Sequence, residues 1–351
     1  MTKITVAVLF GGRSSEHAIS LLSAHNVLRS IPKKYKVIPI GIKKDGSFLF
    51  FPKEPYLLHT EDPKKICLNR TGLPVTFTFG SSPKMLFIKS KKRGPRVDVF
   101  FPILHGAFGE DGTIQGLAQL LDIPCVGASV LGSAIGMDKD ISKRLMRDAK
   151  IPIADFLVFH KEERTKIQFG VIAKKLGLPF FLKPATAGSS VGVHKVKSQK
   201  EFRAMVDDAF LYSEKILFEQ FIDGIEVECA VLGNEKAIVS LPGSIMPQHD
   251  FYSYEAKYLD KQGAVFQIPA ILPKNVTDKI TETALRVYKT LACRGMARVD
   301  GFLKKDGSFV MNEINTIPGF TNISMYPKLW EVSGIAYADL LDRLISLALK
   351  K

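Results

Sequence analysis

Apolar residues along the first third of the chain are spaced in patterns that alternate between strand and helix. The unbroken run from Ile4 to Phe10 predicts a buried strand. Ser14 and Ser15 then offer N-cap side chains to a helix. The apolar face of this helix comprises Ala18, Leu21, Leu22 and Leu28. A later set at i, i+3, i+4 and i+7 predicts a second helix and comprises Ile114, Leu117, Ala118 and Leu121.

Strands predicted between these two helices complete the alternation. They are Val37 to Ile42, Phe48 to Phe51 and Asp98 to Leu104, with Asp45-Gly46 as the turn between the first two. This βαβ order is typical of an open, largely parallel sheet that binds ligands at the carboxyl ends of its strands. The segment from Thr71 to Arg96 is less regular, and we expect it to be an insertion.

The rest of the chain predicts a small strand-and-helix unit and then a strand-rich region. A helix begins at Asp138 and ends before Ile151-Pro152. The predicted strands are Phe180 to Lys183, Val193 to Val196, Ile216 to Phe221, Ile225 to Leu232 and Lys236 to Leu241. Helices follow from Asn275 to Ala292 and from Tyr337 to Leu349. The polar, aromatic stretch from Gln248 to Gln262 predicts a lid loop.

Length and composition indicate a folded protein with several domains. The 351 residues are 46% hydrophobic and 24% charged, which excludes disordered and collagen-like chains. At roughly 150 residues per domain, two or three domains are expected. We place three, at residues 1–128, 129–213 and 214–351. The predicted fold class is α/β with α+β character, and the N-terminal domain has an open parallel sheet.

Charge and cysteine content narrow the classes of partner and compartment. A surplus of 49 Lys and Arg over 35 Asp and Glu gives a net charge of +14, which favours an anionic partner. The densest basic run, Lys89 to Arg96, lacks an aromatic residue for base stacking, so we expect no nucleic-acid partner. The four cysteines form no C-x-x-C pair, which fits a reduced setting. Apolar runs are too short for a spanning helix, so we expect a cytoplasmic protein without a membrane partner.

Two strand-like runs near the C-terminus are joined by Asp306-Gly307, which predicts a two-residue type I′ turn. With that turn, Asp300 faces Glu313 and Arg298 faces Asn315. Because side chains alternate along a strand, all four lie on the same side of the hairpin. Two carboxylates and an amide suit Mg²⁺. The alternative is a surface hairpin whose acids form salt bridges with the arginine, and the hairpin alone leaves both open.

A glycine and serine loop, Pro184 to Gly192, follows the predicted strand that ends at Lys183. Its backbone N–H groups and hydroxyls can converge on a phosphate, and the lysine adds positive charge. The chain has no Gly-Lys pair and no two glycines separated by one residue, which excludes a Walker A loop and a Rossmann fingerprint. A plain flexible turn is the alternative.

Two further polar clusters follow predicted strands, at Gly11 to His17 and at His105 to Gly112. Glu16 in the first cluster is suited either to an ammonium group or to the first turn of a helix. In the second, helix capping is a sufficient explanation for Glu110 and Asp111, and the histidine has no visible metal partner.

These clusters belong to a longer series of motifs in a fixed order. The series is Gly11-Gly12-Arg13-Ser14-Ser15-Glu16-His17, His105-Gly106, Gly109-Glu110-Asp111-Gly112, Met137-Asp138-Lys139, Lys183-Pro184, Gly188-Ser189-Ser190-Val191-Gly192, Glu255-Ala256-Lys257-Tyr258, Arg298-Val299-Asp300, Asn312-Glu313-Ile314-Asn315-Thr316 and Pro318-Gly319. From about residue 4 to residue 347 it resembles the D-alanine–D-alanine ligase family of the ATP-grasp superfamily. The resemblance implies a three-domain ATP-grasp architecture. It also implies an ADP-forming ligase that joins two D-alanines for peptidoglycan precursors, and hence for cell wall and cell shape.

The resemblance implies ATP and two Mg²⁺ or Mn²⁺ ions as cofactors. The implied metal ligands are Asp300, Glu313 and Asn315. The implied nucleotide-binding residues are Lys139, Lys183, Ser190, Glu219, Glu226 and Lys257. Lys257 would reach the γ-phosphate when the lid closes.

The resemblance also assigns catalytic and substrate-binding residues. The catalytic set is Glu16, Ser189, Tyr258, Arg298 and Gly319, and the substrate set is Glu16, His105 and Ser324. Glu16 would receive the ammonium group of the first D-alanine, and Ser324 the carboxylate of the second. The guanidinium of Arg298 and the backbone N–H of Gly319 would stabilise the oxyanion. The partners are D-alanine and ATP, and we expect a homodimer.

Two positions bear on how closely the family applies. Ala185-Thr186-Ala187 stands where the family has a more polar stretch, so the finer contacts of the phosphate loop are open. Tyr258 matches a tyrosine that accompanies dipeptide formation in the family, which favours D-alanine as the second substrate. The alternatives are another ATP-grasp carboxylate–amine ligase, such as a D-alanine–D-lactate ligase, and a non-enzymatic binder of nucleic acid.

Overall fold

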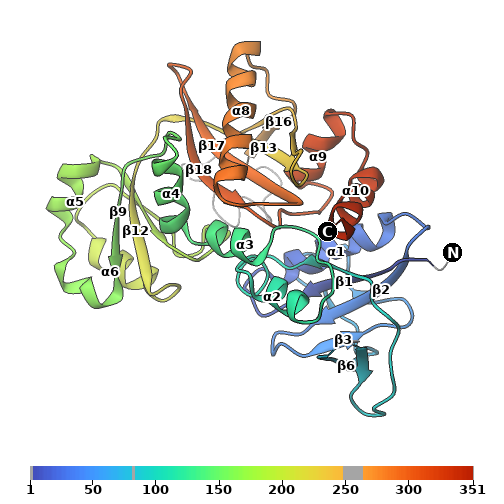
Figure 1. The fold of residues 1–351 in the computed structure, drawn as a ribbon. Coiled ribbons are helices and arrows are strands. Elements are labelled where there is room, and N and C mark those ends of the chain that lie inside the picture. Colours follow the sequence, from blue (N-terminus) through green and yellow to red (C-terminus); the bar gives the residue numbers. More distant parts are fainter. Residues whose placement is uncertain (1–2, 81–83, 248–263, 351) are drawn as a thin grey trace.

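Three main sheets and the helices that cover them build the molecule (Figure 1). The structure is a computed structural model and describes residues 3–80, 84–247 and 264–350. In Figure 1 the first sheet is blue to teal, the second green to yellow, and the third yellow to orange. The predicted lid, Gln248 to Gln262, lies outside the described residues.

The first sheet is built mainly by the N-terminal third of the chain. Its strands, in spatial order, are β7 (Lys84–Phe87), β6 (Leu73–Thr78), β3 (Phe48–Phe50), β2 (Lys36–Ile42), β1 (Thr5–Gly11) and β8 (Val99–Ile103). A separate pair consists of β4 (Leu57–Leu58) and β5 (Cys67–Leu68). Helix α1 (His17–Ser30) shares a core with Val6 and Phe10 of β1, whereas α2 (Thr113–Leu120) shares one with Ala7. Both faces of β1 are therefore buried, which explains its unbroken apolar run.

Parallel pairing in this sheet is limited to β2, β1 and β8, so the expectation of a largely parallel sheet holds for its centre only. The expected insertion at Thr71 to Arg96 is wrong, because β6 and β7 extend the same sheet as an antiparallel hairpin. Their irregular polarity has a physical cause. Strands at the edge of a sheet are partly exposed, so they lack the continuous apolar run of a central strand.

Helix α1 begins later than its serines suggested. Glu16 is the N-cap residue, and neither Ser14 nor Ser15 caps the helix. The Ser14 hydroxyl instead donates to the carbonyl of His105 at 2.7 Å and accepts from the N–H of Glu16 at 3.2 Å. Ser14 thus ties together the loops that follow β1 and β8.

The second sheet is small and rich in aromatic residues. Its strands, in spatial order, are β11 (His194–Val196), β10 (Phe180–Pro184), β12 (Lys215–Gln220) and β9 (Phe156–His160). The helices of this region are α3 (Val130–Met137), α4 (Lys139–Asp148), α5 (Phe169–Leu176), α6 (Phe202–Ala209) and the 3-10 helix η1 (Lys161–Lys166). The placed domain boundary at residues 213/214 falls immediately before β12, which pairs with β9 and β10. The three-domain division stays a prediction.

The third sheet carries the C-terminal hairpin. Its main strands, in spatial order, are β16 (Ala264–Gln267), β15 (Gly243–Pro247), β13 (Gly224–Leu232), β17 (Met296–Lys304) and β18 (Phe309–Asn315), and β14 (Ile238–Val239) pairs with β13. Its helices are α8 (Lys274–Thr290), α9 (Met325–Val332) and α10 (Tyr337–Leu349). One apolar cluster contains Ala230 of β13, Leu344 of α10 and Val6 of β1. The first and third sheets therefore share a core.

The C-terminal hairpin has the predicted pairing at the site but not the predicted turn. Asp300 faces Glu313 and Arg298 faces Asn315, as expected. Near the turn, however, Phe302 faces Val310 rather than Met311. The loop has one residue more than predicted, with Gly307 in the left-handed region at φ +76°. A β-bulge between Asp300 and Gly301 then restores the register, so two deviations cancel.

Among the described residues, no helix combines the length and the apolar character that crossing a bilayer requires.

The aromatic core of the second sheet yields a stability prediction. Phe218 is fully buried, and its ring lies 5.7 to 5.9 Å from those of Phe159, Phe180 and Phe202. We expect Phe218→Ala to lower the free energy of unfolding by about 3–5 kcal/mol, because the cavity cannot close fully. The control Phe79→Ala, at a side chain that is 64% exposed, should change it by less than about 0.5 kcal/mol. Urea unfolding measures both, and equal effects would contradict the assignment of this core.

Candidate active site

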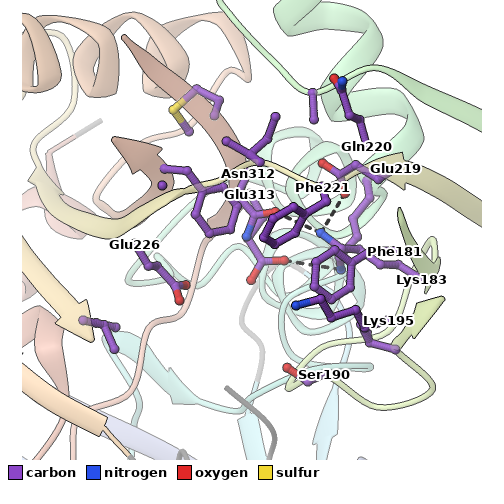
Figure 2. A pocket seen from close by; sticks show the side chains of 18 of the residues that line it. Phe181, Lys183, Ser190, Lys195, Glu219, Gln220, Phe221, Glu226, Asn312 and Glu313 are labelled. Atoms are coloured by element: carbon purple, nitrogen blue, oxygen red, sulfur yellow. Dashed lines mark hydrogen bonds and ion pairs between the residues drawn. The ribbon is translucent and has the colours of Figure 1, made fainter. Parts of the chain in front are cut away.

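Two hollows meet at the C-terminal hairpin, and Glu313 lines both. The first is a cavity of about 350 Å³ between the second and third sheets (Figure 2). Most of the residues expected to bind nucleotide line it, namely Lys139, Lys183, Ser190, Glu219 and Glu226. Lys257, the remaining one, lies outside the described residues.

Aromatic rings form one wall of the first cavity. The ring centroids of Phe181 and Phe221 are 6.2 Å apart, and Lys195 lies 4.7 Å from the centroid of Phe221. Figure 2 shows Glu226 across the cavity from Phe181 and Lys195. The sequence reasoning missed Phe181, Phe221 and Lys195 as residues of this wall. Alternation along β10 was the available signal, because Phe181 precedes Lys183 by two residues and so shares its face.

A buried ion cluster holds Lys183 at the edge of this cavity. Glu219 accepts from Lys143 Nζ at 2.5 Å and lies 2.7 Å from Lys183 Nζ. Burial favours the neutral carboxyl, but the two lysines outweigh it and lower the pKa of Glu219. Burial lowers the pKa of Lys143 against the opposite effect of Glu219. Lys143 was missed, although it follows Lys139 by four residues and so lies on the same face of α4.

The glycine and serine loop adopts a strained backbone over the cavity. Ser189 and Ser190 both have left-handed conformations, with φ of +50° and +59°. Lys139 Nζ donates to the carbonyl of Ala187 at 2.7 Å, which holds the loop against α4. The role of this loop in binding phosphate stays a prediction.

The bulge in the hairpin brings in another residue that the sequence reasoning missed. Asn312 is the extra residue of β18, and its Oδ1 accepts from Lys183 Nζ at 3.0 Å. The contact exists because the bulge turns Asn312 toward the cavity. Nothing in the spacing of the sequence indicates the bulge.

The second hollow, of about 90 Å³, lies between the loops of the first sheet and the C-terminal hairpin. It gathers most of the residues expected to be catalytic or to bind substrate: Glu16, His105, Ser189, Arg298, Gly319 and Ser324. Tyr258 lies outside the described residues. Residues separated by most of the chain therefore share one small space.

Glu16 is held tightly on one wall of this hollow. Its carboxylate accepts from the Ser189 hydroxyl. A Cβ at Gly106 would come within 2.5 Å of Glu16 Oε2, and one at Gly188 within 3.0 Å. Both loops can approach the carboxylate because they have glycine there.

His105 is buried beside the hollow as a neutral imidazole. Its Nδ1 donates to the carbonyl of Ile317 at 3.0 Å, and its Nε2 lies 3.1 Å from Ser23 Oγ. Burial lowers the pKa of His105. The ring thus links α1 to the loop after β18.

Glu110 also lines the second hollow, where only helix capping was expected. Burial, and next the charge of Glu16, raises its pKa to about 8. The sequence offered no signal for this environment, because it depends on a contact with Ile317, 207 residues away.

Arg298 lies between two buried acids. Its guanidinium donates to Asp300 at 2.7 and 2.8 Å and lies 2.9 Å from Glu228. Asn315 donates to Asp300 at 2.8 Å. Of the two hairpin acids, Asp300 thus does form an ion pair with the arginine, but it is a buried acid rather than the surface acid considered in the alternative.

The oxygen donors of the hairpin fit a hard divalent cation. Asp300, Glu313 and Asn315 share one face, and Glu313 also lies 3.6 Å from Lys139 Nζ. Because the amide nitrogen of Asn315 is bonded to Asp300, its Oδ1 is the atom suited to a metal. Within residues 3–80, 84–247 and 264–350, no cluster of three His, Cys, Asp or Glu side chains offers a metal site. The hairpin set therefore depends on its amide oxygen as the third donor.

Gly319 and Ser324 form the far wall of the second hollow. A Cβ at Gly319 would lie 2.6 Å from Ser324 Oγ. Ser324 is the N-cap residue of α9, and its hydroxyl accepts from the N–H of Thr321 at 3.0 Å. The backbone of this loop is thus held close to a hydroxyl at a helix N-terminus.

Comparison with known proteins gives consistent matches along the chain. Residues 5–128 match the family described as D-ala D-ala ligase N-terminus, and residues 145–346 match D-ala D-ala ligase C-terminus. A D-alanine–D-alanine ligase from Oceanobacillus iheyensis is 49% identical over 351 residues, which cover 99% of this chain and 96% of that protein. The D-alanine–D-alanine ligase structure from Coxiella burnetii has a TM-score of 0.85 at 35% identity, covering 99% of this chain and 94% of that one. The VanG D-Ala:D-Ser ligase structure from Enterococcus faecalis has a TM-score of 0.87 at 35% identity, covering 99% of this chain and 100% of that one.

The buried ion cluster yields a stability prediction. We expect Glu219→Gln to lower the free energy of unfolding by about 3–5 kcal/mol, because it leaves the charges of Lys143 and Lys183 buried without their counter-ion. The control Glu214→Gln removes the partner of Lys161 at a side chain that is 81% exposed, and should cost less than about 0.5 kcal/mol. Urea unfolding near neutral pH measures both. A loss below 1 kcal/mol (about the size of a surface effect) for Glu219→Gln would show that the cluster is not stabilising.

Proposed function

The chain belongs to the D-alanine–D-alanine ligase family, which has the ATP-grasp fold, and we propose how its two hollows carry out the reaction. The protein is an ATP-dependent ligase that forms D-alanyl-D-alanine for cell wall synthesis. The observation that carries the proposal is that Glu313 lines both the lysine-rich cavity and the small hollow of Glu16. A phosphate donor in the first is thereby adjacent to an acceptor in the second.

The first cavity is the proposed ATP site. The adenine ring would lie against Phe181 and Phe221, where apolar faces are available for stacking. Lys139 and Lys183 would bind the phosphates as point charges, with N–H groups of the glycine and serine loop around them. Glu226, across the cavity, would contact the ribose. We propose that Asp300, Glu313 and Asn315 hold a pair of Mg²⁺ or Mn²⁺ ions, which would neutralise phosphate charge.

The second hollow is the proposed site of both D-alanines. Glu16, fixed by Ser189, would bind the ammonium group of the first D-alanine. The carboxylate oxygen of this first D-alanine would attack the γ-phosphorus of ATP, releasing ADP and forming a D-alanyl phosphate. The amine of the second D-alanine would then attack the acyl carbon, and phosphate would leave.

Charge that develops on the acyl oxygen requires preorganised donors. Arg298 is held by two buried acids, so its guanidinium is fixed before the reaction begins. The N–H of Gly319 would be the second donor. Ser324, at the N-terminus of α9, would bind the carboxylate of the second D-alanine. The roles of Lys257, His105 and Tyr258 stay as the family implies them.

We also propose, from family membership, a homodimer in the cytoplasm with D-alanine and ATP as its partners. The +14 net charge stays unexplained beyond the lysines and the arginine of the site. Exposed lysines are the plainest account of the remainder.

Substrate identity is tested by product formation. With ATP and Mg²⁺, we expect D-alanine to give ADP, phosphate and the dipeptide in equal amounts. D-lactate and D-serine offered as competitors at neutral pH should not displace the second D-alanine. Coupled ADP release and mass spectrometry of products measure both. Absence of D-alanine-dependent ADP would overturn the function, and a mixed product would overturn the strictness of the second site.

The metal assignment is tested at the hairpin. We expect Glu313→Gln to reduce kcat at least about a thousandfold, because a carboxylate ligand between the two hollows is lost. Circular dichroism should stay unchanged, since Glu313 is only partly buried. The control Glu282→Gln, at an exposed position on α8, should keep the wild-type rate. A Glu313→Gln rate near wild type, with unchanged dependence on Mg²⁺ concentration, would show that the assignment is wrong.

A further inference from the structure

The backbone of Ile317 is bonded on both sides by side chains from the loop after β8. Its N–H donates to Glu110 Oε1 at 3.0 Å, and its carbonyl accepts from His105 Nδ1 at 3.0 Å. Both contacts join the first sheet to the loop that follows the C-terminal hairpin. They fix the two consecutive peptide units that flank the Cα of Ile317 in that loop.

The second oxygen of Glu110 is bonded to its own loop. Glu110 Oε2 accepts from the N–H of Gly106 at 2.8 Å. Gly106 lies directly against the carboxylate of Glu16, because a Cβ added at Gly106 would come within 2.5 Å of Glu16 Oε2. One carboxylate therefore bridges a residue that contacts Glu16 and a residue two positions before Gly319.

Local structure does not require this bridge. Asp111 already shapes the loop, accepting from the N–H of Phe108 at 2.7 Å and from that of Thr113 at 2.9 Å. Glu110 lies next to Asp111, but one of its oxygens accepts a hydrogen bond from Ile317, 207 residues away. Its role is thus to join two segments rather than to cap a helix.

Only an acceptor with two oxygens at this reach can make both bonds. A carboxyl group has an accepting lone pair on each of its two oxygens, whether it is ionised or protonated, whereas a glutamine amide offers one acceptor and would place an N–H₂ donor against a backbone N–H. An aspartate keeps both oxygens but is shorter by one methylene. The geometry is therefore specific to glutamate.

We propose that Glu110 is a positioning residue that sets the separation between the ammonium site at Glu16 and the oxyanion donor at Gly319. Both of its oxygens are bonded to backbone N–H groups, so it acts through Gly106 and Ile317. The inference rests on the proposed function, because it assumes that these two sites serve one substrate.

Glu110→Gln tests the bridge. We expect kcat to fall about tenfold to a hundredfold, because the oxyanion donor is no longer held in place when one buried N–H loses its acceptor. KM for ATP should stay within about threefold of wild type, since the first cavity does not contain Glu110. Glu110→Asp should show a similar loss of kcat. Rescue by aspartate would show that the length of the side chain does not matter, and would overturn the proposal.

Asp111→Asn is the matched control, since it changes the neighbouring acid and disturbs only local bonds. Its kcat should stay within about threefold of wild type, even if its thermal midpoint falls as far as that of Glu110→Gln. Equal losses of kcat in the two variants, or a rise in KM for ATP that matches the fall in kcat, would overturn the positioning role.

Hydrogen exchange separates this proposal from the proposed function. We expect the amides of Ile317, Gly319 and Phe320 to exchange about tenfold faster in Glu110→Gln and in Glu110→Asp than in wild type. If the variants exchange faster but the wild type forms no dipeptide, the bridge is supported and the proposed function is wrong. If the wild type forms the dipeptide but both variants exchange at the wild-type rate, only the positioning role of Glu110 is wrong. If Glu110→Gln does not fold, the aspartate variant decides by the same two measurements.

Discussion

The apolar core shared by the first and third sheets is the constraint on which the site depends. Val6 of β1, Ala230 of β13 and Leu344 of α10 belong to one buried cluster. Burial of that surface holds together segments from opposite ends of the chain. The walls of the small hollow come from those same segments, so its width is a consequence of packing rather than of local structure.

Electrostatics in this protein is organised by burial. Lys183 and Arg298 each line a hollow, and each is anchored by a buried acid that lines the same hollow, Glu219 and Glu228 respectively. In a medium of low dielectric such pairs fix the direction of a charge, although their net contribution to stability is small. The positive charges are thereby in place before a phosphate arrives, which is what preorganisation requires.

The hairpin shows how a correct prediction can depend on cancelling errors. Alternation and the Asp306-Gly307 signal predicted that Asp300 faces Glu313, and the structure has that pair. It reaches the pair through a longer turn and a bulge at Asn312, neither of which apolar periodicity encodes. The bulge has a use of its own, since it brings Asn312 to Lys183. Turn length and bulges depend on what packs against a strand, so spacing alone cannot fix them.

Periodicity and motif order by themselves determined most of the elements, the family and many of the residues that line the two hollows. They did so because strands and helices repeat locally and because several of the motifs follow strand ends. Only the tertiary structure decided the antiparallel edge of the first sheet, the Lys143–Glu219 pair across 76 residues and the bond from Ile317 to Glu110 across 207. In the sequence alone, nothing distinguished Lys143 from a surface lysine or Glu110 from a helix-capping residue. Their roles come from long-range burial, which removes water as a partner and leaves one protein group to replace it.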